Sequence, residues 1–241
     1  MKRQKIRKFL LLLSFLLFPI TLFYFSPYLI IQGGAAGIIT GSFMTFAALF
    51  LLSLLFGRAF CGWLCPAGGL QECCFTVTDK PVKSKKIKRL KYVIWILWLL
   101  GVFAAFLSAG GIQSIDFFYM TDHGISASGL SGLMTYFGII FLIAILALTL
   151  GKRGMCHSIC WMAPFMVLGT KLKDWLSLPS LKLKPNPDKC IHCRLCTKKC
   201  PMSLEVNTMV AAGNMKNSEC ILCGECADGC PKKVITLTFR K

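Results

Sequence analysis

The sequence predicts an α-helical membrane protein with four transmembrane helices, arranged as two tandem helix pairs, followed by a small α+β domain at the C-terminal end. Two observations predict this division. First, 55% of the 241 residues are hydrophobic although the net charge is +18, a combination that is rare in soluble domains. Second, eight of the 14 cysteines fall within residues 190–230. The chain is therefore expected to have a lipid-facing part and a separate cysteine-rich part.

The distribution of charge predicts the helices. Residues 9–57 contain no Lys, Arg, Asp or Glu, and in residues 92–151 the only charged side chains are Asp116 and Asp122. One crossing of a bilayer needs about 20 apolar residues, and each stretch has a Gly-rich or polar break near its middle. We therefore expect transmembrane helices at residues 9–30, 37–56, 92–111 and 133–150.

Basic residues predict the orientation. All 28 Lys and Arg lie in residues 2–8, 58–91 and 152–241, and the two intervening loops have none. Because cytoplasmic loops are enriched in Lys and Arg, we expect a multi-pass cell-membrane protein with both termini in the cytoplasm. No small-residue cleavage site follows the first apolar run promptly, so an uncleaved helix is expected rather than a signal peptide. The expected division is 1–170 for the transmembrane domain, 171–187 for a linker and 188–241 for the C-terminal domain.

Two copies of one cysteine pattern define the C-terminal domain. Residues 190–201 and 220–231 both read Cys-x2-Cys-x2-Cys-x3-Cys-Pro. This spacing is typical of two-cluster bacterial ferredoxins, in which the fourth cysteine of each run binds the other [4Fe–4S] cluster. We therefore predict a ferredoxin-like domain that binds two [4Fe–4S] clusters. The predicted ligands are Cys190, Cys193, Cys196 and Cys230 for cluster 1, and Cys220, Cys223, Cys226 and Cys200 for cluster 2.

Other interpretations of these runs fit less well. Structural zinc sites usually use two separated Cys-x2-Cys pairs, whereas here three cysteines run together before the fourth. Disulfide frameworks belong to small domains of oxidising compartments, which conflicts with the Lys-rich flank of this segment. His192 lies inside the first run and is interpreted as a spacer, because the cysteines already supply the ligands.

Two further cysteine pairs repeat at the cytoplasmic ends of the second and fourth predicted helices. Both motifs read Arg-x2-Cys-x3-Cys, starting at Arg58 and Arg153. If each helix continues, a step of four places both sulfurs on one face, and parallel repeats could face one another across their interface. One hypothesis is a four-thiolate site for a third iron-sulfur cluster or another soft metal. The alternative is that the cysteines are buried free thiols that pack helix ends. The four cysteines are Cys61, Cys65, Cys156 and Cys160.

These motifs resemble a family of membrane-bound polyferredoxins. The family includes the NapH quinol-dehydrogenase subunit of periplasmic nitrate reductase systems and NosR-like proteins of nitrous-oxide reductase maturation. The resemblance rests on Phe60–Pro66, on the pair Cys156 and Cys160, and on the two C-terminal runs. One departure is that the family places Pro directly after the second cysteine of both membrane motifs, whereas Trp161 follows Cys160 here.

The resemblance implies an electron-transfer subunit of a quinol dehydrogenase-type oxidoreductase system. It would pass electrons between the (mena)quinol pool and a partner oxidoreductase, with the quinol between helices near Arg58 or Arg153. Two alternatives stay open, a metal-reducing or maturation factor for a partner metalloenzyme and a structural anchor for a partner complex. The basic residues follow the cytoplasmic membrane edge, so nucleic acid is not expected as a partner. The outer loop 116–124 is expected to be structural.

Overall fold

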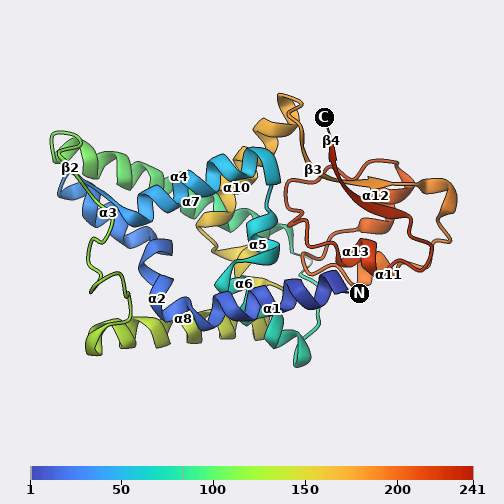
Figure 1. Ribbon diagram of the computed structural model, residues 1–241, viewed down its shortest axis with the longest axis horizontal. Coiled ribbons are helices and arrows are strands. Elements are labelled where there is room, and N and C mark those ends of the chain that lie inside the picture. The colour runs from blue at the N-terminus through green and yellow to red at the C-terminus, as the bar shows by residue number, and fades with distance from the viewer. Residues whose placement is uncertain (1, 83, 241) are drawn as a thin grey trace.

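The computed structural model describes residues 2–82 and 84–240 and is elongated, with the long helices toward one end and the C-terminal domain at the other (Figure 1). The helical part consists of α1 (Lys2–Leu16), α2 (Phe18–Thr21), η1 (Leu22–Phe25), α3 (Pro27–Ala35), α4 (Gly41–Phe56), α5 (Ala59–Trp63), α6 (Pro66–Cys73), η2 (Cys74–Thr76), α7 (Lys85–Ser108), α8 (Gly129–Leu150), α9 (Gly154–Ser158) and α10 (Met162–Trp175).

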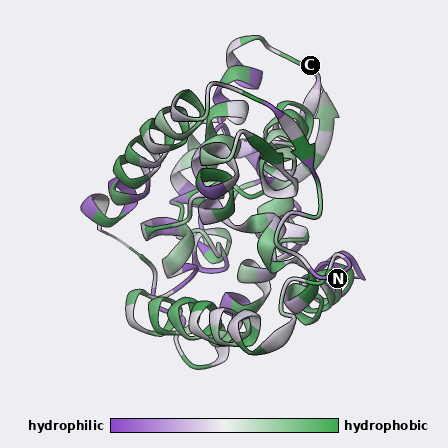
Figure 2. Ribbon diagram, turned by 90° about the vertical axis from the view of Figure 1, so that its left-hand side faces the viewer, coloured by the Kyte–Doolittle hydropathy of each residue, from purple (hydrophilic) through white to green (hydrophobic). Residues whose placement is uncertain are grey.

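Two of the described helices, α7 and α8, are long and apolar enough to cross a membrane. A third candidate arises if α1 and the segment Phe18–Phe25, which meet at a bend of 58°, are counted as one span. Figure 2 shows that hydrophobic residues predominate along the long helices. The chain therefore has two or three candidate spans by length and composition.

The first predicted helix, 9–30, is wrong as a continuous element. The chain runs through α1, α2, η1 and α3 instead. Proline lacks a backbone N–H and its ring clashes with the preceding turn, so Pro19 and Pro27 coincide with new helix starts. Ser26 caps α3 because its side chain accepts a hydrogen bond from the Leu29 N–H. The other three predicted helices are present with shifted ends, as α4, α7 and α8.

A small parallel sheet joins the ends of the two helical halves that lie away from the C-terminal domain. Strand β1 (Ile38–Thr40) pairs with β2 (Ser114–Asp116), with Ile39 opposite Ile115. Thr40 then begins α4 by accepting a hydrogen bond from the Phe43 N–H. The outer loop is thus attached to the first half of the chain, which supports its expected structural role.

The C-terminal domain is built around an antiparallel strand pair. It consists of β3 (Ser180–Pro185), η3 (Pro187–Lys189), α11 (Leu195–Lys198), α12 (Val206–Ala211), α13 (Glu225–Asp228) and β4 (Ile235–Arg240). The register of the pair places Ser180 opposite Arg240 and Pro185 opposite Ile235. The segment 171–187, expected as a linker, contains the end of α10 and the whole of β3.

Buried ion pairs connect the C-terminal domain to the helical part. Glu219 accepts hydrogen bonds from Arg58, from Lys91 at 2.7 and 2.8 Å and from the Tyr92 hydroxyl. Arg7 is 1% exposed and contacts Glu72 and Glu225, both at 2.8 Å. Burial opposes ionisation of Glu219, but Arg58 and Lys91 outweigh burial and lower its pKa to about 2.

We predict that Glu219→Gln destabilises the attachment of the C-terminal domain, because it leaves the buried charges of Arg58 and Lys91 unpaired. Removing one partner of a buried ion pair costs about 3–5 kcal/mol. Since the pKa of Glu219 is lowered, the contribution of this ion pair is present above the ordinary value of 4.5 and is lost as the pH falls toward 2. Thermal unfolding at neutral pH measures the effect. Glu205→Gln is the matched control, since Glu205 is exposed. Equal melting temperatures for the two variants would contradict the prediction.

Candidate metal centres

The predicted cluster-1 cysteines lie together. Cys190 and Cys193 come from the segment that leads into α11, Cys196 lies within α11, and Cys230 follows α13. All four line one small cavity with Asn207 and Val210 of α12. The fourth cysteine of the second run is thus brought beside the first three of the first run, and the donor set fits a four-thiolate cluster.

The predicted cluster-2 cysteines form the matching set. Cys220, Cys223 and Cys226 line a second small cavity together with Cys200, which ends the first run. Burial raises the pKa of Cys220 to about 11 and that of Cys223 to about 12. Such buried thiols become thiolates only where positive charge lies nearby. Bound iron would supply that charge.

The two membrane motifs follow similar backbone paths but differ at the arginine that starts each one. Gly57 (φ 54°) ends α4 and Gly151 (φ 96°) ends α8, and a positive φ favours glycine. Arg58 has a φ of −93°, whereas Arg153 has a φ of 49° and is separated from Gly151 by Lys152. The Cys65 N–H then donates to the Phe60 carbonyl at 3.0 Å, and at the equivalent position the Cys160 N–H donates to the Met155 carbonyl at 3.1 Å. The internal repeat read from the sequence is therefore also a repeat in structure.

The helices do not continue through the motifs, so the condition for a helical step of four between the two cysteines is not met. Helix α5 ends at Trp63 and α9 ends at Ser158, so Cys65 and Cys160 lie beyond the helix ends. Their sulfurs nevertheless face the same space as those of Cys61 and Cys156. We name these four residues the cysteine quartet. All four are 7% exposed or less and line one cavity.

That cavity has a volume of about 490 Å³ and is mostly apolar. It reaches from the cysteine quartet to Met120 and Ser131 at the side of the molecule away from the C-terminal domain. Most of its wall comes from the broken segment Phe18–Gln32 and from α8. The Gln32 Oε1 atom is buried without a hydrogen-bond partner among the described residues. The wall of the cavity therefore contains an acceptor that has no partner among the described residues.

Polar side chains hold the cysteine quartet in place. Arg153 Nη1 donates to the Cys61 carbonyl at 2.6 Å, and Gln71 Nε2 lies 3.3 Å from Cys156 Sγ. Met166 Sδ lies 3.5 Å from Cys61 Sγ. Burial, together with the neighbouring Cys156 and Cys61, raises the pKa of Cys160 to about 12. Within the described residues no three His, Cys, Asp or Glu side chains close on a single-ion position; the four sulfurs instead surround a shared cavity.

Arg58 and Arg153 do not line the cavity that we expected near them. Arg58 pairs with Glu219, and Arg153 pairs with Glu72. Both side chains are 1% exposed or less. Cys73, which is exposed, and Cys74 also lie outside this cavity.

Sequence reasoning missed Glu219, Glu72 and His157. Glu219 directly precedes the first cysteine of the second run, and acidic residues are scarce in this chain, with 10 in all; that scarcity was the available signal. His157 is 1% exposed, and neither ring nitrogen has a partner among the described residues. Burial, with Lys88 and Lys91 nearby, lowers the pKa of His157 to about 3, so its ring is neutral.

The cysteine quartet packs directly against the cluster-2 segment. Trp63 Nε1 donates to the Leu222 carbonyl at 3.2 Å. Cys61 and Cys156 share one buried core with Cys200, Cys223 and Cys226. The cysteine quartet and the predicted cluster-2 ligands are therefore neighbours in one core, against which Cys190, Cys196 and Cys230 of cluster 1 also pack.

Comparison with known families agrees with this arrangement. A family described as "4Fe-4S binding domain" matches residues 38–88 and 133–179, and each match contains one membrane cysteine pair. A family described as "4Fe-4S dicluster domain" matches residues 182–231. The chain therefore carries 4Fe-4S binding domains in both its helical and its C-terminal parts.

Several known proteins are similar to this chain. The uncharacterized protein MJ0749 of Methanocaldococcus jannaschii is 28% identical over 78% of this chain and 67% of its own length. YccM of Escherichia coli, provisionally named an electron transport protein, is 24% identical over 88% of this chain and 59% of its own length. NirI of Paracoccus denitrificans is 28% identical over 76% of this chain and 26% of its own length. No solved structure matches.

The matched domains and these relatives support an iron-sulfur, ferredoxin-like membrane protein of electron transport. The chain spans little more than half of YccM and about a quarter of NirI. None of these comparisons singles out the NapH or NosR-like branch.

We predict that Gly62→Ala separates the cysteine quartet from the cluster-2 segment. A Cβ atom at Gly62 would lie 2.3 Å from the Ile221 carbonyl oxygen, a distance that requires backbone movement. We expect a lower melting temperature and altered electron paramagnetic resonance of the reduced protein. Gly138→Ala is the matched control, because nothing lies within 4 Å of its Cβ position. If both variants behave like the unaltered protein, the close packing described at Gly62 is incorrect.

Proposed function

We propose that this protein transfers single electrons between a quinol in the membrane and a redox partner at the cytoplasmic side. The observation that carries the proposal is the position of the cysteine quartet. It lies between an apolar cavity of about 490 Å³ and the core that contains the cluster-2 cysteines. A redox group held there would connect the two.

In this proposal the eight C-terminal cysteines bind two [4Fe–4S] clusters with the ligand sets predicted from the sequence. The cysteine quartet binds a third cluster, which is supported by the two matches to a 4Fe-4S binding domain. When bound, such clusters accept and release one electron at a time. The protein contributes thiolates, an apolar surrounding and buried arginines whose positive charge favours the added electron.

The quinol would occupy the cavity. Its apolar wall, formed by side chains such as Phe18 and Ile143, suits a quinone ring. The unpartnered Gln32 Oε1 atom can accept a hydrogen bond from a quinol hydroxyl. The opposite ring edge would then point toward the cysteine quartet, where electrons leave.

We further propose four membrane crossings with both termini in the cytoplasm. The broken segment from α1 to α3 would make the first crossing, and α4 the second. Helices α7 and α8 supply the other two. The basic residues at the C-terminal-domain ends of these helices support this orientation.

A second candidate function is reduction or delivery of a soft metal ion for a partner metalloenzyme. The observation that favours it is Met166 Sδ, 3.5 Å from Cys61 Sγ, because thiolate and thioether ligands together select ions such as Cu(I). Under this alternative the cysteine quartet would bind copper tightly and carry no labile sulfide.

Iron content distinguishes these assignments. We predict about twelve irons per chain, four for each of three clusters. The double variant Cys61→Ser with Cys156→Ser should lose about four of them, and the paramagnetic signals of the C-terminal clusters should remain. The double variant Cys73→Ser with Cys74→Ser serves as control. About eight irons in the unaltered, anaerobically purified protein would remove the third cluster.

Quinol oxidation tests the cavity. We predict that Gln32→Leu raises the KM for a menaquinol analogue about fivefold, because the variant loses one hydrogen bond to the quinol. Gln113→Leu is the matched control, because Gln113 is exposed and does not line the cavity. The measurement is the steady-state rate of cluster reduction in detergent. If the unaltered protein is not reduced at all, the quinol assignment is incorrect.

A further inference from the structure

The negative charge of the C-terminal domain is concentrated on the side that contacts the helical part. Residues 188–241 contain five carboxylates. Glu219 pairs with Arg58 and Lys91, Glu225 with Arg7 and Asp228 with Arg3. Three of the five are therefore neutralised within the molecule.

The opposite side of the domain is basic. Four exposed basic residues flank the predicted cluster-1 ligands in sequence and do not line the cavity against the helical part, namely Lys189, Arg194, Lys232 and Lys233. Lys198 and Lys199 lie toward the helical part, because they line a cavity with Arg7. Within residues 2–82 and 84–240 none of the first four takes part in an ion pair. The remaining carboxylates, Asp188 and Glu205, are both exposed. The end of the molecule farthest from the membrane helices therefore has an excess of positive charge.

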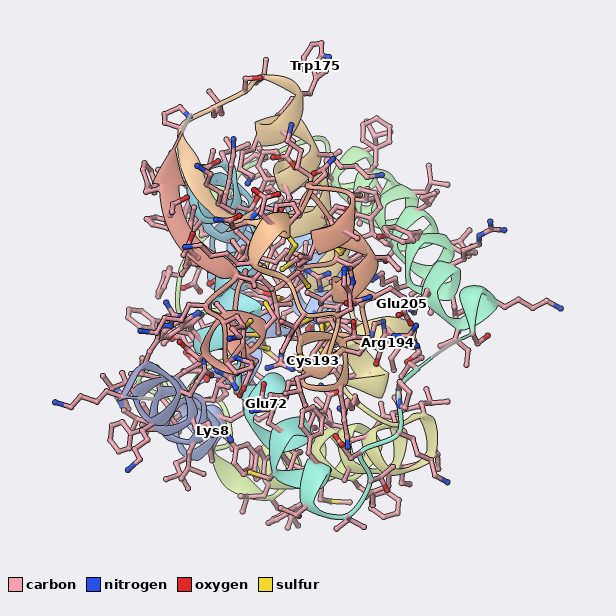
Figure 3. The ribbon with its side chains drawn as sticks, turned by 90° about the vertical axis from the view of Figure 1, so that its right-hand side faces the viewer. Lys8, Glu72, Trp175, Cys193, Arg194 and Glu205 are labelled. Carbon is pink, nitrogen blue, oxygen red and sulfur yellow. The ribbon has the colours of Figure 1, made fainter. Side chains whose placement is uncertain are left out.

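Apolar side chains and a cysteine are exposed within this basic side. Ile191 is 57% exposed and Leu195 39% exposed, and Cys193 between them is also exposed. Figure 3 looks onto this end and shows Cys193 and Arg194 near the middle of the face. A small apolar centre with a charged rim is the usual composition of a transient protein interface.

The equivalent face of the cluster-2 segment is covered. Gln4 Nε2 donates to the Cys223 carbonyl at 3.0 Å, and Trp63 contacts the Leu222 carbonyl. Cys223 and Cys226 are buried, whereas Cys193 is exposed. Of the two predicted cluster sites, cluster 1 is thus the one open to a partner in the described structure.

Arg194 differs from its counterpart in the second run. Arg194 (φ 58°) and Gly224 (φ 75°) follow the second cysteine of their runs, and both adopt the left-handed conformation. Glycine is favoured in that conformation and a long side chain is not. Gly224 also leaves room for Arg3, whose Nη2 atom would lie 3.2 Å from a Cβ there. The first run keeps an exposed guanidinium at the position where local structure favours glycine.

We propose that the face around Cys193, with its four flanking basic residues, is the docking surface for an acidic one-electron carrier protein. This inference rests on the proposed electron-transfer function and identifies the kind of partner. Opposite charges steer such partners into encounter, and the apolar centre of the face brings the carrier close to cluster 1. One electron leaves cluster 1, which is oxidised, and the carrier is reduced by that electron.

The test uses the full chain in nanodiscs of neutral phosphatidylcholine, with its clusters reduced by dithionite and excess reductant removed. Oxidised acidic flavodoxin is the probe, and its flavin takes up one electron and one proton. Basic cytochrome c is the probe of opposite charge.

The variants are Arg194→Gly and the triple change Arg194→Gly, Lys232→Gln, Lys233→Gln. Lys216→Gln, an exposed lysine of the same domain away from cluster 1, is the control. Stopped-flow absorbance gives the bimolecular rates.

We expect the rate with flavodoxin to fall steeply as ionic strength rises, and to fall about tenfold in the triple variant. The rate with cytochrome c should not fall in that variant. Arg194→Gly suits the local backbone, so a slower rate with an unchanged melting temperature reports lost docking. Unchanged flavodoxin rates, or an equal loss in Lys216→Gln, would overturn the inference. Because dithionite supplies the electrons, failure of quinol reduction would leave this result intact.

Discussion

The buried contact between the helical part and the C-terminal domain is the constraint on which the rest of the arrangement depends. Arg7, Arg58 and Lys91 are each 1% exposed, and their partners Glu225 and Glu219 come from the other domain. Buried ion pairs often contribute little more stability than apolar side chains of similar size. Their effect here is on orientation, because each charge is satisfied only when the two parts meet in one way.

That orientation brings the cysteine quartet against the C-terminal cysteine sets. Gly62 approaches the Ile221 carbonyl so closely that a side chain would not fit. Cys61 and Cys156 thereby enter the same core as Cys200 and Cys223. Without this close approach the cysteine quartet and the C-terminal cysteine sets would be separate sites joined only by the chain. The proposed transfer of electrons from the cavity to the exposed Cys193 depends on this contact.

The sequence predicts this protein best where the information is local. The two cysteine runs have spacings that few other structures require, and the absence of charge marks the apolar helices directly. Reasoning from the sequence fails where a contact joins residues that are far apart in the chain. Glu219 meets Arg58 across 161 positions of the chain, and no periodicity indicates such a contact. Hydropathy also treats residues 9–30 as one helix, because the prolines that break it are themselves compatible with an apolar segment.

The two membrane motifs show how a repeat can keep its geometry while its members acquire different contacts. Arg58 contacts the C-terminal domain through Glu219, whereas Arg153 contacts Glu72 within the helical part. Cys65 is followed by Pro66, which begins α6; Cys160 is followed instead by Trp161. The Trp161 Nε1 atom donates to the Phe25 carbonyl at 2.9 Å, and its ring lines the apolar cavity. The departure from the family pattern therefore falls at the wall between the cysteine quartet and the broken first segment. Proline at position 161 would remove both this hydrogen bond and the indole ring. Trp161, the residue at which the sequence departs from the family pattern, therefore shapes the cavity.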